Sequence, residues 1–139
     1  MPVKQILLVD DSLPWQRFVR EMFESEADLK IIATATDGSE AIQKARELQP
    51  DVILMDISLP GLNGFEATRQ IRRLSPASKI LFLSEHSSTD LIEAALQVGG
   101  SGYVWKSNCR SHLLTAIRVI LRDQQFVSRS LRNLRWVRD

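Results

Sequence analysis

Five short apolar runs divide the chain, and each is followed by a stretch long enough for a helix. They cover residues 6–9, 29–33, 52–55, 80–83 and 103–105. Three of the runs are continuous and rich in branched side chains rather than alternating with polar residues. A continuous run is typical of a strand buried on both faces, as in a parallel sheet. The pattern therefore predicts five buried strands.

The stretches between these strands carry apolar residues at the spacing of an amphipathic helix. After the first strand, Ser12 is predicted to cap a helix that has Pro14 in its first turn. The apolar stripe of this helix comprises Trp15, Phe18, Val19, Met22 and Phe23. The second helix is predicted to be capped by Ser39 and stopped by Pro50, and the third to run from Phe65 to Leu74. The fourth is predicted to end at Gly99-Gly100, and the fifth to cover 113–121.

A strand–helix unit repeated five times predicts an α/β fold. Right-handed crossovers favour a single doubly wound, five-stranded parallel sheet of flavodoxin-like order 2-1-3-4-5, with helices on both faces. The 139 residues suffice for one domain, which we predict at residues 1–122. Residues 123–139 are predicted to be a C-terminal tail or linker. Its arginines fit either a solvated helix face or a linker that reaches toward DNA.

Composition narrows the class without naming a function. Hydrophobic residues make up 44% and charged residues 25% of the chain, and the net charge is +1. This balance favours neither nucleic acid nor a membrane surface as a partner, and no apolar run is long enough to span a bilayer. The first residues do not resemble a signal peptide, and the single Cys109 cannot form an internal disulfide. We therefore expect a cytoplasmic protein in which Cys109 is an ordinary helix residue.

Acidic residues follow two of the predicted strands. Asp10 and Asp11 come after the first strand, and Asp56 ends the third. In the predicted strand order these two strands flank the point where a doubly wound sheet binds its ligands. Three carboxylates there would repel one another unless a hard divalent cation such as Mg²⁺ or Mn²⁺ were bound between them. Taken one at a time, each aspartate could instead cap the following helix.

Two more polar residues follow strands at the same edge of the sheet. Ser84 comes after the fourth strand and Lys106 after the fifth. A lysine can balance carboxylates and phosphoryl oxygens, and a hydroxyl can donate to a phosphoryl oxygen. Either residue alone would be an ordinary surface or turn residue, so only the whole set is informative.

These motifs resemble the receiver domain of two-component response regulators. The resemblance rests on the order and spacing of Leu8-Val9-Asp10-Asp11, Asp56-Ile57-Ser58-Leu59-Pro60 with Gly64, Leu83-Ser84, and Gly102-Tyr103-Val104-Trp105-Lys106. It extends from about Gln5 to Leu121. The segment from Ser111 through Leu131 also resembles the receiver end of regulators that carry a LuxR-type DNA-binding domain.

The resemblance implies a role for each of these residues. Asp56 would accept a phosphoryl group from a sensor histidine kinase or a phosphotransfer protein and become an aspartyl phosphate. Asp11, Asp56 and the backbone carbonyl of Ser58 would bind Mg²⁺ directly, and Asp10 would bind it through water. Lys106 would contact the phosphoryl group. Ser84 would turn toward that group, and Tyr103 would follow inward as an aromatic switch.

The family also implies an output. Phosphorylation would alter the face formed by the fourth helix, the fifth strand and the fifth helix, which could support a homodimer. DNA would be bound only through an output domain that this chain lacks, and a membrane would not be involved. Such a protein is a signalling phosphoacceptor that catalyses only its own phosphorylation and dephosphorylation.

Four positions modify this expectation. Ser107 follows Lys106 where the family usually has a proline after a cis bond, so either isomer is possible at this bond. Glu85 stands where a small residue is usual and could repel an incoming phosphoryl group. Ser58 and His86 occupy positions that in the family tune hydrolysis of the aspartyl phosphate.

Three alternatives stay open. A phosphatase with an aspartate nucleophile would need a second acid two residues later, and that position is Ser58. A flavin-binding module would need a Ser/Thr/Gly-rich loop after the first strand, where Asp10 and Asp11 stand. A degenerate receiver would act as a phosphorylation-independent docking module, for which Glu85 and Ser107 are the arguments.

Overall fold

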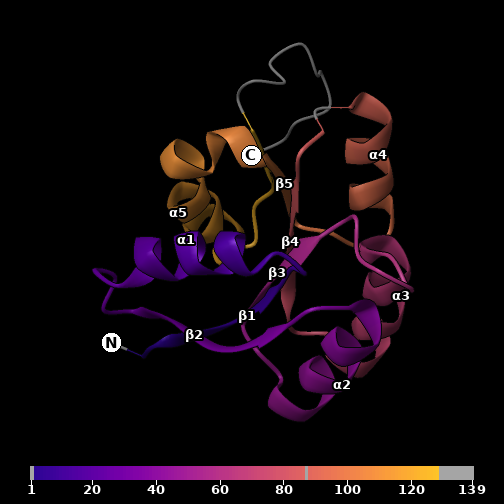
Figure 1. Cartoon of the computed structure of the whole chain (residues 1–139), viewed down its shortest axis with the longest axis horizontal. Coiled ribbons are helices and arrows are strands. Elements are labelled where there is room, and N and C mark those ends of the chain that lie inside the picture. Colours follow the sequence, from indigo (N-terminus) through magenta and orange to yellow (C-terminus); the bar gives the residue numbers. More distant parts are fainter. Residues whose placement is uncertain (1, 87, 129–139) are drawn as a thin grey trace.

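The computed structural model describes residues 2–86 and 88–128 and has the predicted alternation of strands and helices (Figure 1). The strands are β1 Lys4–Val9, β2 Leu29–Ala35, β3 Val52–Asp56, β4 Lys79–Ser84, β5 Gly102–Trp105 and β6 Phe126–Val127. The helices are α1 Leu13–Phe23, α2 Gly38–Leu48, α3 Gly64–Leu74, α4 Thr89–Gln97, the short 3₁₀ turn η1 Lys106–Asn108, and α5 Cys109–Ile120. None of these helices is long and apolar enough to cross a bilayer.

The sheet is parallel throughout and has the order β2-β1-β3-β4-β5-β6. The predicted order of the first five strands is confirmed. The sixth strand was not predicted and lies in the segment expected to be a tail. The Phe126 amide donates to the Ser101 carbonyl at 3.3 Å, and the Ser128 amide donates to the Tyr103 carbonyl at 3.0 Å. Two residues are too few for a periodic pattern, so only the tertiary pairing reveals this strand.

Two helical layers cover the sheet, as Figure 1 shows. Helices α1 and α5 bury one face, and α2, α3 and α4 bury the other. Along β1, Ile6 and Leu8 pack toward α1 and α5, while Leu7 and Val9 pack toward the opposite layer. Both faces of the central strands are therefore buried under helices, which explains their continuous apolar runs.

Side-chain caps set the helix starts. Ser12 accepts from the Trp15 amide at 3.3 Å, as predicted. The prediction that Ser39 caps α2 is wrong, because Asp37 lies in extended backbone just before the helix and accepts from the Glu40 amide at 2.8 Å. The carboxylate of Asp37, two residues earlier than the serine, thus caps the helix.

The backbone at the end of β5 is regular. The described residues contain no cis peptide bond, so the bond between Lys106 and Ser107 is trans. The chain continues from this bond into η1 and α5. Lys106 is therefore the first residue beyond β5, at the same sheet edge as the ends of β1, β3 and β4.

Candidate functional site

Three carboxylates meet at the carboxyl edge of the sheet. Asp10 and Asp11 follow β1, Asp56 ends β3, and one ligand oxygen from each lies within 4.8 Å of the others. Asp10 and Asp56 are 1% and 6% exposed, whereas Asp11 is open to solvent. The register explains the approach, because Val9 pairs with Met55, so Asp10 and Asp56 come next at the ends of two adjacent strands. The predicted acidic cluster is therefore confirmed as a geometric fact.

A pocket of about 150 Å³ surrounds this cluster. The side chains that line it are Asp10, Asp11, Ser12, Asp56, Ser58, Glu85, His86 and Lys106. The lining comes from the ends of β1, β3, β4 and β5 and from the residues that follow them. Ser58, Glu85 and His86 are exposed, so they form the rim, while Asp10, Asp56 and Lys106 form the buried wall.

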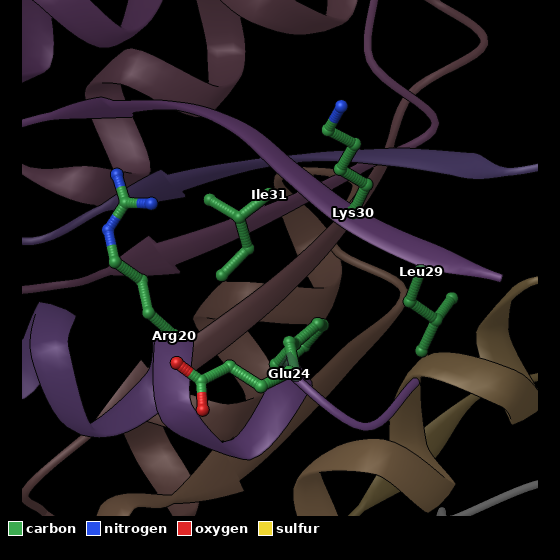
Figure 2. A pocket seen from close by; sticks show the side chains of 6 residues that line it. Arg20, Glu24, Leu29, Lys30 and Ile31 are labelled. Atoms are coloured by element: carbon green, nitrogen blue, oxygen red, sulfur yellow. The ribbon is translucent and has the colours of Figure 1, made fainter. Parts of the chain in front are cut away.

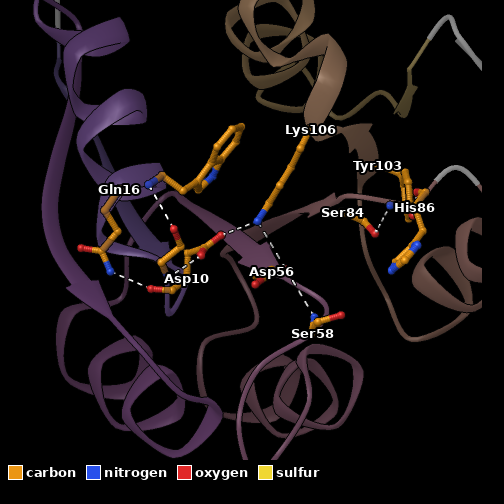
Figure 3. A network of polar contacts seen from close by, with 10 residues as sticks. Asp10, Gln16, Asp56, Ser58, Ser84, His86, Tyr103 and Lys106 are labelled. Carbon is orange, nitrogen blue, oxygen red and sulfur yellow. Dashed lines mark hydrogen bonds and ion pairs between the residues drawn. The ribbon is translucent and has the colours of Figure 1, made fainter.

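Local hydrogen bonds orient the buried carboxylates (Figure 3). Asp10 accepts from the Ser12 amide at 2.9 Å through Oδ1, and Gln16 in α1 donates to the Asp10 carbonyl at 2.6 Å. Asp56 Oδ1 accepts from the Ser58 amide at 3.3 Å. Gln16 was not identified from the sequence, because a glutamine in the second turn of a helix carries no signal of its own.

Gly64 allows α3 to start against the end of β3. A Cβ at this position would lie 2.4 Å from the Asp56 carbonyl oxygen and 3.0 Å from the Ile57 Cα. Both neighbours are backbone atoms that cannot turn away as a side chain would. The absence of a side chain at Gly64 therefore permits this close approach to the Asp56 backbone.

Lys106 supplies the positive charge of the pocket. Its Nζ lies 2.8 Å from Asp10 Oδ2 and 3.8 Å from Asp56 Oδ1, and its side chain is only 9% exposed. The sequence predicted that Lys106 would reach this edge. It did not predict that the shorter contact would be with Asp10 rather than Asp56.

The acidic pocket carries more negative than positive charge around Asp56. The pKa of Asp56 is raised to about 6, mainly by burial and in addition by the negative charges of Asp10 and Asp11. Lys106 and the Ser58 amide act in the opposite direction. Three carboxylates thus face one ammonium group. Converging carboxylate oxygens with an excess of negative charge fit a hard divalent cation such as Mg²⁺ or Mn²⁺.

Ser84 and Tyr103 bind the same loop residue. The Ser84 hydroxyl accepts from the His86 amide at 3.0 Å, and the Tyr103 hydroxyl donates to the His86 carbonyl at 2.6 Å. Tyr103 is fully buried, and this burial raises its pKa against a smaller opposing effect of Ser84. The two residues expected to form a switch are therefore linked through His86 backbone.

A second pocket lies at the other end of α1 (Figure 2). It has a volume of about 270 Å³ and is lined by Arg20, Phe23, Glu24, Leu29, Lys30 and Ile31. Its charges are of both signs and belong to side chains that project to the rim, around an apolar floor from α1 and β2. It holds no converging carboxylates, so the acidic pocket is the better candidate for chemistry.

Comparison with known proteins agrees with this geometry. The family model described as the response regulator receiver domain matches residues 6–118. Similar proteins include the transcriptional regulatory protein DegU of Brevibacillus brevis, 32% identical over 123 residues that cover 88% of this chain and 52% of DegU. The response regulator UvrY of Escherichia coli strain K12 is 33% identical over 123 residues, covering 88% of this chain and 56% of UvrY. The chain thus spans about half the length of these relatives.

A solved structure extends the likeness to the fold. It is that of a two-component response regulator of the LuxR family from Aurantimonas sp. SI85-9A1. Its sequence is 35% identical, its TM-score to this chain is 0.89, and the match covers 94% of both chains.

Proposed function

The chain belongs to the response regulator receiver domain family, and from this premise we propose that Asp56 accepts a phosphoryl group from a sensor histidine kinase or a phosphotransfer protein. One observation carries the proposal. The buried Asp56 carboxylate shares its pocket with Asp10, Asp11 and the Lys106 ammonium group, which lies 3.8 Å from Asp56 Oδ1. The pocket at the other end of α1 has no such combination among its lining residues.

In the transfer, an Asp56 oxygen attacks the phosphorus of the donor. A new O–P bond forms, the P–N bond of a donor phosphohistidine breaks, and the freed imidazole takes up a proton. The pKa of about 6 makes Asp56 more basic than an exposed aspartate while leaving it ionised at neutral pH. Because phosphoryl transfer depends mainly on positioning and countercharge, Lys106 stabilises the transferring oxygens.

A divalent cation fits this scheme. Asp10, Asp11, Asp56 and the backbone carbonyl of Ser58 would hold Mg²⁺ or Mn²⁺, which would supply further positive charge to the phosphoryl oxygens. The exposed rim residues Ser58, Glu85 and His86 would then set how easily a donor or a hydrolytic water reaches Asp56.

The switch that we infer uses the His86 contacts. The Ser84 hydroxyl would leave the His86 amide and donate to a phosphoryl oxygen. The loop would then shift, and Tyr103 would carry this change because its hydroxyl is bound to the same residue. The surface formed by α4, β5 and α5 would report the change to partners or to a second copy of the chain.

The output is proposed from the relatives. DegU is a transcriptional regulatory protein by name. A regulator of this kind would act in the cytoplasm and bind DNA through a separate output domain, toward which the segment after residue 122 would lead. The receiver itself would catalyse only its own phosphorylation and dephosphorylation.

A labelling experiment tests the acceptor. With acetyl phosphate and Mg²⁺, the protein should gain one phosphoryl mass, and hydroxylamine should remove it because an acyl phosphate is labile. Asp56→Asn should take no label, since an amide is a far poorer nucleophile. Asp90→Asn, an exposed aspartate in the first turn of α4, is the matched control and should label normally.

The same experiment separates the acceptor from a docking module. Label that persists in Asp56→Asn would mean that another residue is modified. If the wild-type protein takes no label from acetyl phosphate or from any histidine kinase, the remaining interpretation is the phosphorylation-independent docking module. Glu85 at the pocket rim would then be the residue that hinders phosphoryl transfer.

A further inference from the structure

The face of one aromatic ring adjoins the Lys106 ammonium group. The Nζ of Lys106 lies 4.9 Å from the ring centroid of Trp15, within the range of a cation–π contact. Trp15 stands in the first turn of α1, where its amide donates to the Ser12 cap. The Lys106 ammonium group therefore contacts Asp10, lies near Asp56 and faces the Trp15 ring.

The Trp15 ring is held by its own surroundings. The Phe18 ring packs against it at 5.1 Å with an interplanar angle of 38°. On Phe18, in turn, lies the Arg110 guanidinium group from α5, 5.1 Å from the ring centroid. The aromatic pair of α1 thus contacts two cations that both follow β5. This packing fixes the ring beside Lys106 as α1 packs against the start of α5.

The polar atom of Trp15 does not account for its position. Its Nε1 is buried, and no acceptor from the described part of the chain reaches it. A buried donor without an acceptor costs stability. The polar contact that Trp15 makes is therefore through its ring face, which attracts the Lys106 ammonium group.

We propose that Trp15 is a positioning residue that holds Lys106 for phosphoryl transfer, an inference that rests on the function proposed above. Lys106 lies about 1 Å closer to Asp10 than to Asp56. We expect it to move toward Asp56 when that residue carries a phosphoryl group. A cation over a ring face has a broad, weakly directional minimum, so Lys106 can make this shift without losing Trp15. Trp15 would also hold the ammonium group if a divalent cation were bound to Asp10.

A double-mutant cycle without metal tests the contact itself. Trp15→Leu and Lys106→Met are combined, and unfolding by urea is measured in the presence of EDTA. Either single substitution removes the whole contact, so the second substitution should lose nothing more from it. The unfolding equilibrium constant of the double variant should therefore be about three- to tenfold lower than the sum of the two single effects predicts. Trp15→Phe keeps an aromatic face and loses the unpartnered donor, so it should fold well and retain part of the coupling.

Labelling of Asp56 by acetyl phosphate tests the positioning role. Trp15→Leu should slow labelling about three- to tenfold, Trp15→Phe less, and neither should slow it further in Lys106→Met. Val19→Ala creates a cavity on the same helix without touching Lys106 and should leave the rate unchanged.

Two results would overturn the proposal. One is additive loss of stability in the cycle, and the other is slowing by Trp15→Leu that is equally large in Lys106→Met. Either would leave Asp56 labelling, and so the proposed function, intact. A wild-type protein that takes no label would overturn the proposed function and with it the role of Trp15, even if the metal-free cycle shows coupling.

Discussion

Single residues at the acidic pocket work against the stability of the fold. Asp56 has a pKa of about 6 in the folded chain against an ordinary value of 3.8, so the folded state binds a proton that the unfolded state has already lost between these values. Stability therefore falls as the pH rises through this window and stays lower above it. Ionised Asp56 is therefore a destabilising group, as is typical of residues at functional sites.

The pH dependence of stability should change when this carboxylate is removed. In EDTA at pH 7.5, Asp56→Asn should be about 1 to 2 kcal/mol more stable than the wild type, because an amide has no charge to bury. The gain should shrink toward pH 4.5, where wild-type Asp56 is protonated in the folded state. Urea denaturation at the two pH values measures it, and an equal gain at both would contradict the raised pKa.

Among single residues, the sequence predicted those that end strands or directly follow them. Asp10, Asp56 and Lys106 were found because the carboxyl ends of parallel strands share one edge. Gln16 and the Trp15 contact with Lys106 were not found, because both depend on how α1 packs against the sheet. The roles of Ser84 and Tyr103 as a switch stay predictions.

Among the elements, α3 starts directly against the Asp56 backbone. Its capping box of Asn63 and Glu66 starts the helix, and Gly64 brings its first turn against the Asp56 backbone. The local sequence predicted this helix to within one residue. Its distance from Asp56 could not be predicted, since it depends on a contact between two backbone segments.

Gly64→Ala should push these two segments apart. The added methyl group would meet the Asp56 carbonyl at 2.4 Å, so we expect a loss of about 1 to 3 kcal/mol and slower labelling of Asp56. Asn63→Ala is the control, because it removes the cap at a cost of about 1 kcal/mol without entering that contact. Denaturation and acetyl phosphate labelling measure both effects. Normal labelling in Gly64→Ala would show that the close approach does not position Asp56.

The whole molecule was the most predictable level. Five continuous apolar runs with helical stretches between them leave few topologies, and the order of β1 to β5 was predicted correctly. The extra strand β6 and the Asp37 cap escaped prediction because each rests on one or two residues. Contacts between distant segments also join α5 to the loop before β2, where Arg118 donates to Asp28 and Glu26.

The strand β6 has a consequence for how the protein behaves in concentrated solution. Without it, β5 would be an edge strand whose free amides and carbonyls could pair with another chain. A protein ending at residue 122 should therefore self-associate with rising concentration, as seen by light scattering, while one ending at residue 128 should remain dispersed. Equal scattering by the two would show that β5 needs no cover. Two residues of strand, with Val127 buried beside Tyr103, would thus protect the sheet from aggregation.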